Sequence, residues 1–193
     1  VNLISRFYDI QRGTVKIDGY DVKKVSIESL RSQMGIMLQD SFIFSGTILD
    51  NLRYGRLDAT DDEVIAAAKL ANADSFIRQL PNGYQTVIKS DGGSLSQGQR
   101  QMLAIARAAV ADPPALILDE ATSALDNATQ AAVCESLENL HVTRVAIAHR
   151  LSTIMHCDRI FVMEDGKIVE EGTYDQLMEK QGLFYRLANR QMT

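Results

Sequence analysis

The sequence has no excess of positive charge. Its 25 Asp and Glu residues outnumber its 20 Lys and Arg residues, which gives a formal net charge of -5 at pH 7. A nucleic-acid groove needs clustered Lys and Arg, so this balance argues against nucleic acid as a partner. A nucleotide stays compatible with the charge, because backbone N–H groups at the start of a helix hold phosphate without basic side chains.

The sequence is also poor in cysteine and has no long apolar segment. Cys134 and Cys157 are its only cysteines and fit no metal-ligand spacing, so we interpret both as reduced thiols. No apolar run approaches the roughly 18 residues that cross a bilayer, and residues 1–5 lack the features of a signal peptide. The first residue is Val1 rather than Met, and we expect the sequence to be a piece of a longer polypeptide.

The sequence does contain enough apolar residues for one sizeable core, since 46% of its 193 residues are hydrophobic. Apolar strands over 115–118 and 143–148 flank a helix over 127–137. Continuous apolar strands are typical of a parallel sheet that is covered on both faces, so the sequence predicts an α/β fold. A strand over 159–163, a hairpin at 164–167 and helices over 174–180 and 183–191 are expected to follow.

The first part of the chain is predicted to lead into the same sheet. Residues 1–8 have the pattern of the end of an amphipathic helix, and a strand follows at 14–18. A short helix over 27–34 then precedes an apolar strand over 35–38.

Between the two apolar strands at 35–38 and 115–118, the pattern changes to helices. Thr60 and Glu63 form a capping box before one helix, and Asp74 is expected to cap a second. A third helix should begin near Ser96 and end before the two prolines at 113 and 114. We therefore expect a helical subdomain, about 40–112, inserted in an α/β core made of 1–39 and 113–193.

Three features could carry chemistry. The strand 115–118 runs into Asp119 and Glu120, which places two carboxylates where α/β proteins bind ligands; the alternative is a solvated acidic turn. Residues 95–100 open the third helix with a capping Ser and a Gly, which suits a phosphate but also suits an ordinary capped helix. His149 directly follows a strand and could contact a phosphate, although a lone His is often structural.

The order and spacing of these features resemble those of the ATP-binding-cassette (ABC) family. Gln39 resembles the Q-loop glutamine, and residues 95–99 resemble the signature sequence. Residues 118–120 resemble the end of Walker B, residues 123–126 the D-loop, and His149 the switch histidine. The resemblance covers essentially all 193 residues.

The resemblance implies an ATPase that uses ATP and Mg²⁺, with a P-loop NTPase (RecA-like) core. Glu120 would be the base, Asp119 and Gln39 would contact Mg²⁺, and His149 would steady the γ-phosphate. Two such domains would form a homodimer or a heterodimer around two ATP molecules. The signature residues Ser96, Gln97, Gly98 and Gln99 would act at the ATP of the partner domain. The D-loop residue Asp126 would be a further nucleotide-binding residue.

Two stretches are similar to the exporter branch of the family, namely 40–48 and 148–154. Exporters carry such a domain behind a helical membrane domain, at the cytoplasmic face of the membrane. The resemblance therefore implies that the domain powers transmembrane transport. The alternatives are a regulatory cassette without hydrolysis and a soluble cassette ATPase of the DNA-repair or chromosome type. Intact Glu120 and His149 argue against the first, and the absence of long heptad segments between 40 and 94 argues against the second.

The sequence departs from the family in three places. No G-x-x-x-x-G-K-[ST] occurs, so we expect the chain to begin just after this Walker A loop, without the preceding strands. By itself the chain is then expected to bind ATP poorly and to hydrolyse none. Gln97 replaces a glycine of the usual signature, and residues 89–92 lack a glutamate found in many exporters, which leaves the choice between homodimer and heterodimer open.

Overall fold

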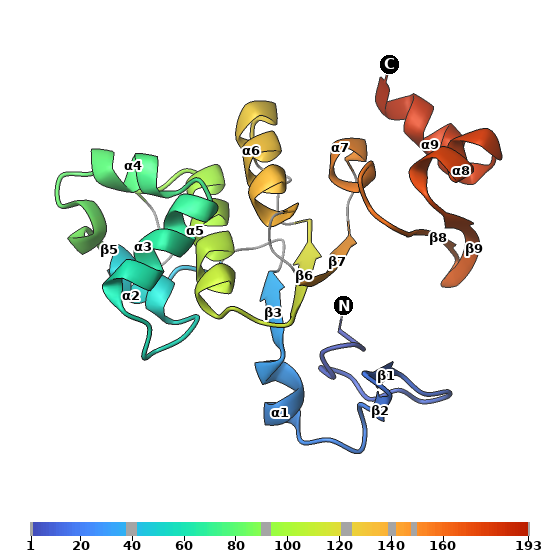
Figure 1. The fold of residues 1–193 in the computed structure, drawn as a ribbon, viewed down its shortest axis with the longest axis horizontal. Helices are drawn as coiled ribbons and strands as arrows, with labels where there is room; N and C mark the ends of the chain where they lie inside the picture. Colours follow the sequence, from blue (N-terminus) through green and yellow to red (C-terminus); the bar gives the residue numbers. More distant parts are fainter. Residues whose placement is uncertain are drawn as a thin grey trace. The chain divides into compact units, whose positions relative to one another are not determined.

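The computed structural model describes residues 2–37, 42–89, 94–120, 125–138, 142–147 and 150–192 (Figure 1). The chain divides into two compact units, Val1–Val145 and Ala146–Thr193. Within the described part of the chain, none of the helices is both long enough and apolar enough to span a bilayer.

A parallel pair of strands forms the centre of the first unit. Strand β3 (Met34–Met37) pairs in parallel with β6 (Ala115–Asp119), and β7 (Thr143–Ile147) is the third strand in the order β3-β6-β7. The middle of β6 is buried, as the sequence predicts for a covered strand. The α/β fold and its parallel sheet are confirmed.

The prediction that the strand at 143–148 is buried is wrong for the described residues. Val145 is 39% exposed and Ile147 is 40% exposed. Strand β7 is the last strand in the order β3-β6-β7, so among the described residues it has a neighbouring strand on one side only. An apolar run predicts that a strand can be buried, and neighbouring elements decide whether it is.

A hairpin and a short helix precede β3. Strands β1 (Lys16–Ile17) and β2 (Tyr20–Asp21) are joined by Asp18 and Gly19, whose φ angles of 50° and 83° suit a tight two-residue turn. Helix α1 (Ile27–Ser32) begins at Ser26, whose hydroxyl accepts from the Ser29 N–H. Four buried side chains then form a cluster with neighbours from this region: Val22, Leu30, Met34 and Ile117.

The helix expected over 1–8 is not formed: residues 2–6 make turns instead. The Phe7 N–H donates to the Asn2 carbonyl at 2.8 Å, and Arg6 has a φ of 52°. The Arg31 guanidinium donates to the carbonyl oxygens of Ser5 and Arg6 and lies over the Phe7 ring. An eight-residue helix is marginal on its own, so these tertiary contacts decide the conformation.

Helices dominate the segment between β3 and β6. The long helix α5 (Gln97–Val110) packs against α2 (Ile48–Arg53) and α3 (Asp61–Leu70). Its inward face is fully buried at Leu103 and nearly so at Ile105. It ends one residue before Ala111, because Pro113 and Pro114 cannot continue a helix. The elements are β4 (Gly46–Thr47), α2 (Ile48–Arg53), α3 (Asp61–Leu70), α4 (Asp74–Gln79), η1 (Gly83–Gln85), β5 (Val87–Ile88) and α5 (Gln97–Val110).

The structure confirms the predicted cap at Thr60 and corrects the predicted cap at Asp74. Thr60 and Glu63 form the expected capping box at the start of α3. Asp74 does not cap α4, because the cap position belongs to Ala73. The Asp74 carboxylate instead accepts from the Arg78 guanidinium at 2.9 Å and from the Tyr84 hydroxyl at 2.7 Å. An acidic residue near the start of a helix can bind other side chains as easily as it can cap the helix. Its spacing in the sequence does not distinguish these two roles.

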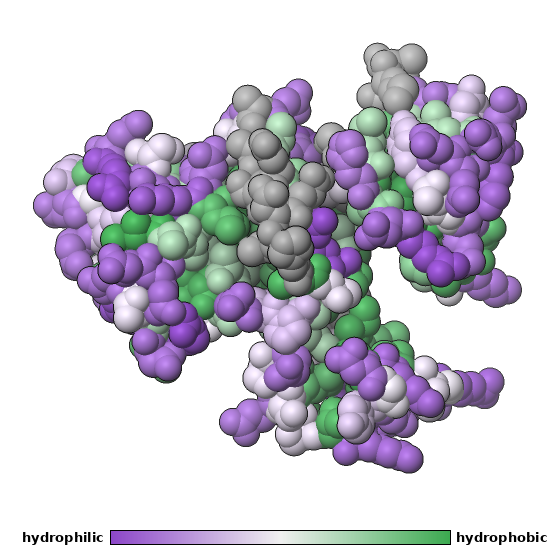
Figure 2. Space-filling model, viewed as in Figure 1, coloured by the Kyte–Doolittle hydropathy of each residue, from purple (hydrophilic) through white to green (hydrophobic). Residues whose placement is uncertain are grey.

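The second unit consists of a hairpin and helices. The predicted hairpin turns at Asp165 and Gly166, both with positive φ. Ile160, Val162, Leu177, Phe184 and Ala188 form the buried core. Figure 2 shows apolar surface near the hairpin, where Met163 and Ile168 are exposed. The elements are α7 (Leu151–Ile154), β8 (Ile160–Glu164), β9 (Lys167–Gly172), α8 (Tyr174–Glu179) and α9 (Leu183–Met192).

Candidate functional site

The predicted acid pair stands at the carboxyl end of β6. Asp119 is the last residue of the strand and Glu120 follows it, and both side chains are partly buried. Because β3 and β6 are parallel, Asp119 and the end of β3 at Met37 lie at the same edge of the sheet. In open α/β sheets this edge is where ligands bind.

The backbone of Glu120 is held in the left-handed region, with a φ of 52°. This region costs a residue with a side chain about 1–2 kcal/mol, so the surrounding structure must impose it. Outliers of this kind cluster at functional sites, where the strained backbone fixes the direction of a side chain. Six other described residues other than glycine share a positive φ, at turns and near helix ends, and of the acid pair only Glu120 has it.

The chemistry of Asp119 suits Mg²⁺. This ion prefers carboxylate oxygens, keeps several waters and is usually held by one or two carboxylates together with substrate phosphates. Among the residues that the structure describes, no group of three or more His, Cys, Asp and Glu could form a metal cage. Such a cage is not needed when a single carboxylate at the end of a strand shares the ion with phosphate oxygens.

The predicted phosphate-binding helix terminus is formed by α5. The Ser96 hydroxyl accepts from the Gln99 N–H at 3.1 Å, and the Gln99 side-chain oxygen accepts from the Ser96 N–H at 2.9 Å. This capping box uses the backbone N–H groups of Ser96 and Gln99. The N–H groups of Gln97 and Gly98 belong to the first turn, where a helix has no acceptor of its own to offer. They are available for an anion at the positive end of a 14-residue helix.

Asp126 stands at the start of helix α6 (Asn127–Glu138). Its carboxylate accepts from the Thr129 N–H at 3.0 Å and from the Thr129 hydroxyl at 2.8 Å. The structure thus shows a helix-capping role for Asp126 beside the nucleotide-binding role that the sequence predicts. Gln39 and His149 lie outside the described residues, as do residues 121–124 of the predicted Walker B and D-loop region.

Sequence reasoning missed an aromatic surface that follows Gln39 closely in the chain. Three rings make it up, and they are exposed by 64% at Phe42, 39% at Phe44 and 51% at Tyr54. The Phe44 ring contacts both other rings, with centroids 4.9 Å from Phe42 and 4.5 Å from Tyr54. We call these three residues the aromatic patch. Their crowding into a short, otherwise ordinary stretch was the signal available in the sequence.

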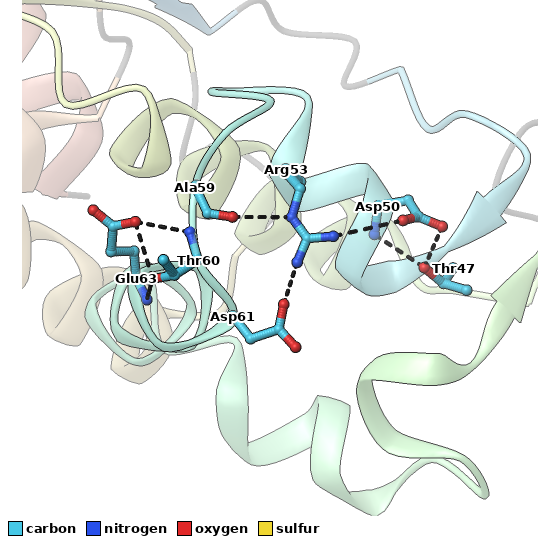
Figure 3. A network of polar contacts seen from close by, with 7 residues as sticks. All are labelled: Thr47, Asp50, Arg53, Ala59, Thr60, Asp61 and Glu63. Atoms are coloured by element: carbon cyan, nitrogen blue, oxygen red, sulfur yellow. Dashed lines mark hydrogen bonds and ion pairs between the residues drawn. The ribbon is translucent and has the colours of Figure 1, made fainter.

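The helix that ends beside Tyr54 is tied down by charged side chains (Figure 3). Arg53 donates to the Ala59 carbonyl at 3.1 Å and pairs with Asp61 at the start of α3. Arg56 pairs with Glu63 at 2.6 Å, and this hydrogen bond, with those from Thr60, lowers the pKa of Glu63 to about 2. The end of α2 and the start of α3 are therefore linked by ion pairs that persist across the physiological pH range.

An acid pair at a sheet edge and a phosphate-ready helix terminus on one α/β unit are typical of a nucleotide-binding protein. Comparison with known proteins gives the same class. Residues 1–123 match the family described as ABC transporter. The ABC transporter ATP-binding protein YfiC of Bacillus subtilis is 51% identical over 98% of the chain. The fatty acid ABC transporter ATP-binding/permease protein of Mycobacterium tuberculosis is 47% identical over 97% of it.

A solved structure agrees with these relatives. The structure of a bacterial Atm1-family ABC exporter with ATP bound matches the whole chain with a TM-score of 0.96 and 43% identity. The chain therefore belongs to the ABC transporter family. It spans about a third of the length of these proteins, 32% of YfiC, 30% of the mycobacterial protein and 34% of the exporter chain.

Proposed function

We propose that this chain is the ATP-hydrolysing part of an ABC exporter and powers the transport of a substrate across a membrane. The observation that carries the proposal is the Asp119–Glu120 pair at the end of β6, with Glu120 in the left-handed conformation. The family and the likeness to an exporter with ATP bound support it.

In this proposal each acid has one role. Glu120 accepts a proton from the attacking water, and its fixed backbone aims the carboxylate at that water. Asp119 would hold Mg²⁺, which would supply positive charge beside the phosphates of ATP. Gln39 contacts the ion and the water, and His149 donates a hydrogen bond to the γ-phosphate.

The start of α5 acts on the ATP of a second ATP-binding domain. The Gln97 and Gly98 N–H groups supply donors, and the helix dipole adds a favourable potential for the γ-phosphate. Ser96 and Gln99 hold this turn in shape, and Asp126 contributes at the same interface. The second domain is a further copy of this chain or a related chain. The helical segment, about 40–112, forms the subdomain that carries this turn.

The aromatic patch is the surface that contacts the membrane domain. Exposed, mutually stacked rings are typical of the centre of a protein interface rather than of free surface. The relatives are about three times as long as this chain, and the mycobacterial protein is named as both an ATP-binding and a permease protein. The site of action is then the cytoplasmic face of a membrane.

The test uses the full-length transporter with Glu120→Gln. We expect ATP affinity to stay within about twofold, while the ATP turnover rate falls by about 10²–10⁴, the usual worth of a general base. Glu164→Gln, at the exposed end of β8, is the matched control and should keep the wild-type rate. Normal turnover by Glu120→Gln rejects Glu120 as the base. A wild-type transporter that binds ATP without hydrolysing it supports a regulatory cassette instead.

A further inference from the structure

Arg107 joins α5 to two distant parts of the chain. Its Nε donates to the Asn51 carbonyl at 2.8 Å, its Nη1 to the Phe42 carbonyl at 3.0 Å, and its Nη2 to the Asn51 side-chain oxygen at 3.1 Å. Its guanidinium also lies over the Phe44 ring, 5.3 Å from the centroid. The planar fork of Arg can make such a set of bonds at once, and a Lys ammonium cannot.

Asn51 completes this contact from inside α2. The side chain is fully buried. Its amide oxygen accepts from the Phe44 N–H at 2.9 Å as well as from Arg107, and its amide nitrogen donates to the carbonyls of Phe44 at 2.9 Å and Thr47 at 3.0 Å. All four hydrogen-bonding positions of this amide are thus used, and two of the four bonds hold the backbone of Phe44 in the aromatic patch.

Two further contacts tie the same region to the end of α5. The backbone of Gly55 lies directly against the Arg107 carbonyl oxygen, and the Arg56 Nε donates to the Val110 carbonyl at 3.4 Å. Tyr54, the third ring of the patch, lies in the sequence between Asn51 and Gly55. The segment that carries the patch is therefore joined to α5 at several points.

We infer that Arg107 is a positioning residue that couples the aromatic patch to the signature turn of α5. Arg107 stands about 16 Å along the helix from Ser96, at 1.5 Å per residue. A displacement of the membrane domain against the patch is carried by Arg107 and Asn51 into α5 and so to Ser96–Gln99. This inference rests on the proposed function, since it assigns the patch to a membrane domain and the turn to ATP.

The inference is tested in the full-length transporter in lipid nanodiscs with Arg107→Lys, Asn51→Ala and the double variant. We expect kcat for ATP hydrolysis to fall at least fivefold in Arg107→Lys with KM for ATP unchanged within twofold, because no residue that touches the domain's own ATP is altered. Hydrogen exchange of the Phe44 amide should speed up at least tenfold, while the amides of α5 from 101 to 105 keep their protection. The double variant should lose less than the sum of the two single variants, because either change alone removes the bond between the Arg107 Nη2 and the Asn51 side-chain oxygen.

Two control variants separate positioning from general stability. Arg78→Lys removes an exposed Arg that pairs with Asp74 and should leave both readouts at wild-type values. Ala66→Gly weakens the exposed face of α3 without touching Arg107 or Asn51. If Ala66→Gly lowers kcat as much as Arg107→Lys does, Arg107 is merely structural and the inference is overturned. Unchanged Phe44 exchange in Arg107→Lys overturns it as well. A wild-type transporter without ATPase activity defeats the proposed function, while the exchange measurement still decides the contact.

Discussion

Gly55 and Arg107 meet backbone to backbone: a β-carbon on Gly55 would overlap the carbonyl oxygen of Arg107. The same imagined atom would lie 3.1 Å from the Ala111 nitrogen. Both obstacles are main-chain atoms at the end of α5, one in its last turn and one at its C-cap, and neither can rotate away. Position 55 therefore requires glycine, because a side chain there would collide with the backbone of Arg107.

Gly55→Ala should therefore destabilise the first unit by about 1–3 kcal/mol, the range for forcing extra volume into a packed contact. Urea unfolding followed by circular dichroism measures this. Gly35→Ala is the comparison, because its added carbon meets side-chain atoms only, the Leu116 Cδ1, which can rotate, and the Pro113 Cγ, whose ring can change its pucker. It should cost less. An equal or larger cost for Gly35→Ala would show that the backbone of Arg107 yields more easily than the structure implies.

The left-handed backbone of Glu120 predicts a reversal of the usual preference for Ala over Gly. At position 120, Gly should be more stable than Ala by about 1 kcal/mol, because only Gly adopts this conformation without strain. At Ala66, on the exposed face of α3, Gly should instead be less stable than Ala by about 1 kcal/mol. Both pairs are compared by chemical denaturation. The same preference at both positions contradicts the conformation assigned to Glu120.

Glu170 caps the last helix of the second unit. Its carboxylate accepts from the backbone N–H groups of Leu183 at 2.6 Å and Phe184 at 3.0 Å. The bond from Phe184 contributes most to lowering the pKa of Glu170, and the bond from Leu183 lowers it further. A lowered pKa in the folded state means that the carboxylate stabilises the fold above the pKa of the unfolded chain. That contribution is lost as the pH falls through the folded pKa.

Glu170→Ala should therefore cost about 1 kcal/mol at pH 7, as for other helix caps, and the cost should shrink as the pH falls below about 4.3. Protection of the α9 amides from hydrogen exchange measures the effect within the second unit. Glu171→Ala is the neighbouring control, since Glu171 makes an exposed pair with Arg159 that contributes little. A cost for Glu170→Ala that is constant from pH 3 to pH 7 would rule out the charged cap.

Local patterns predicted much of this fold. The capping box at Thr60 and the capping serine Ser96 were predicted because both depend on residues that are close in the sequence, and Pro113 ended α5 as expected. The position of the acid pair was predicted from the apolar strand that directly precedes Asp119, which is also a local pattern. These features need no knowledge of what lies elsewhere in the chain.

Contacts between distant residues could not be predicted in this way. Arg107 and Asn51 are 56 positions apart, and nothing in the spacing of either pointed to the other. The turns at residues 2–6 depend on Arg31, which no helical period near the N-terminus reveals. Asp74 was mistaken for a cap because its partner Tyr84 is brought close only by the fold.

The capping box at the start of α5 also affects the entropy of binding. Ser96 and Gln99 already hold each other, so the first turn is ordered before any phosphate arrives. A ligand that meets Gln97 and Gly98 then need not immobilise this backbone, and more of the interaction energy is retained as affinity. The side chain of Gln97 is exposed and lies outside the box, so it can differ from the usual glycine without loosening the turn.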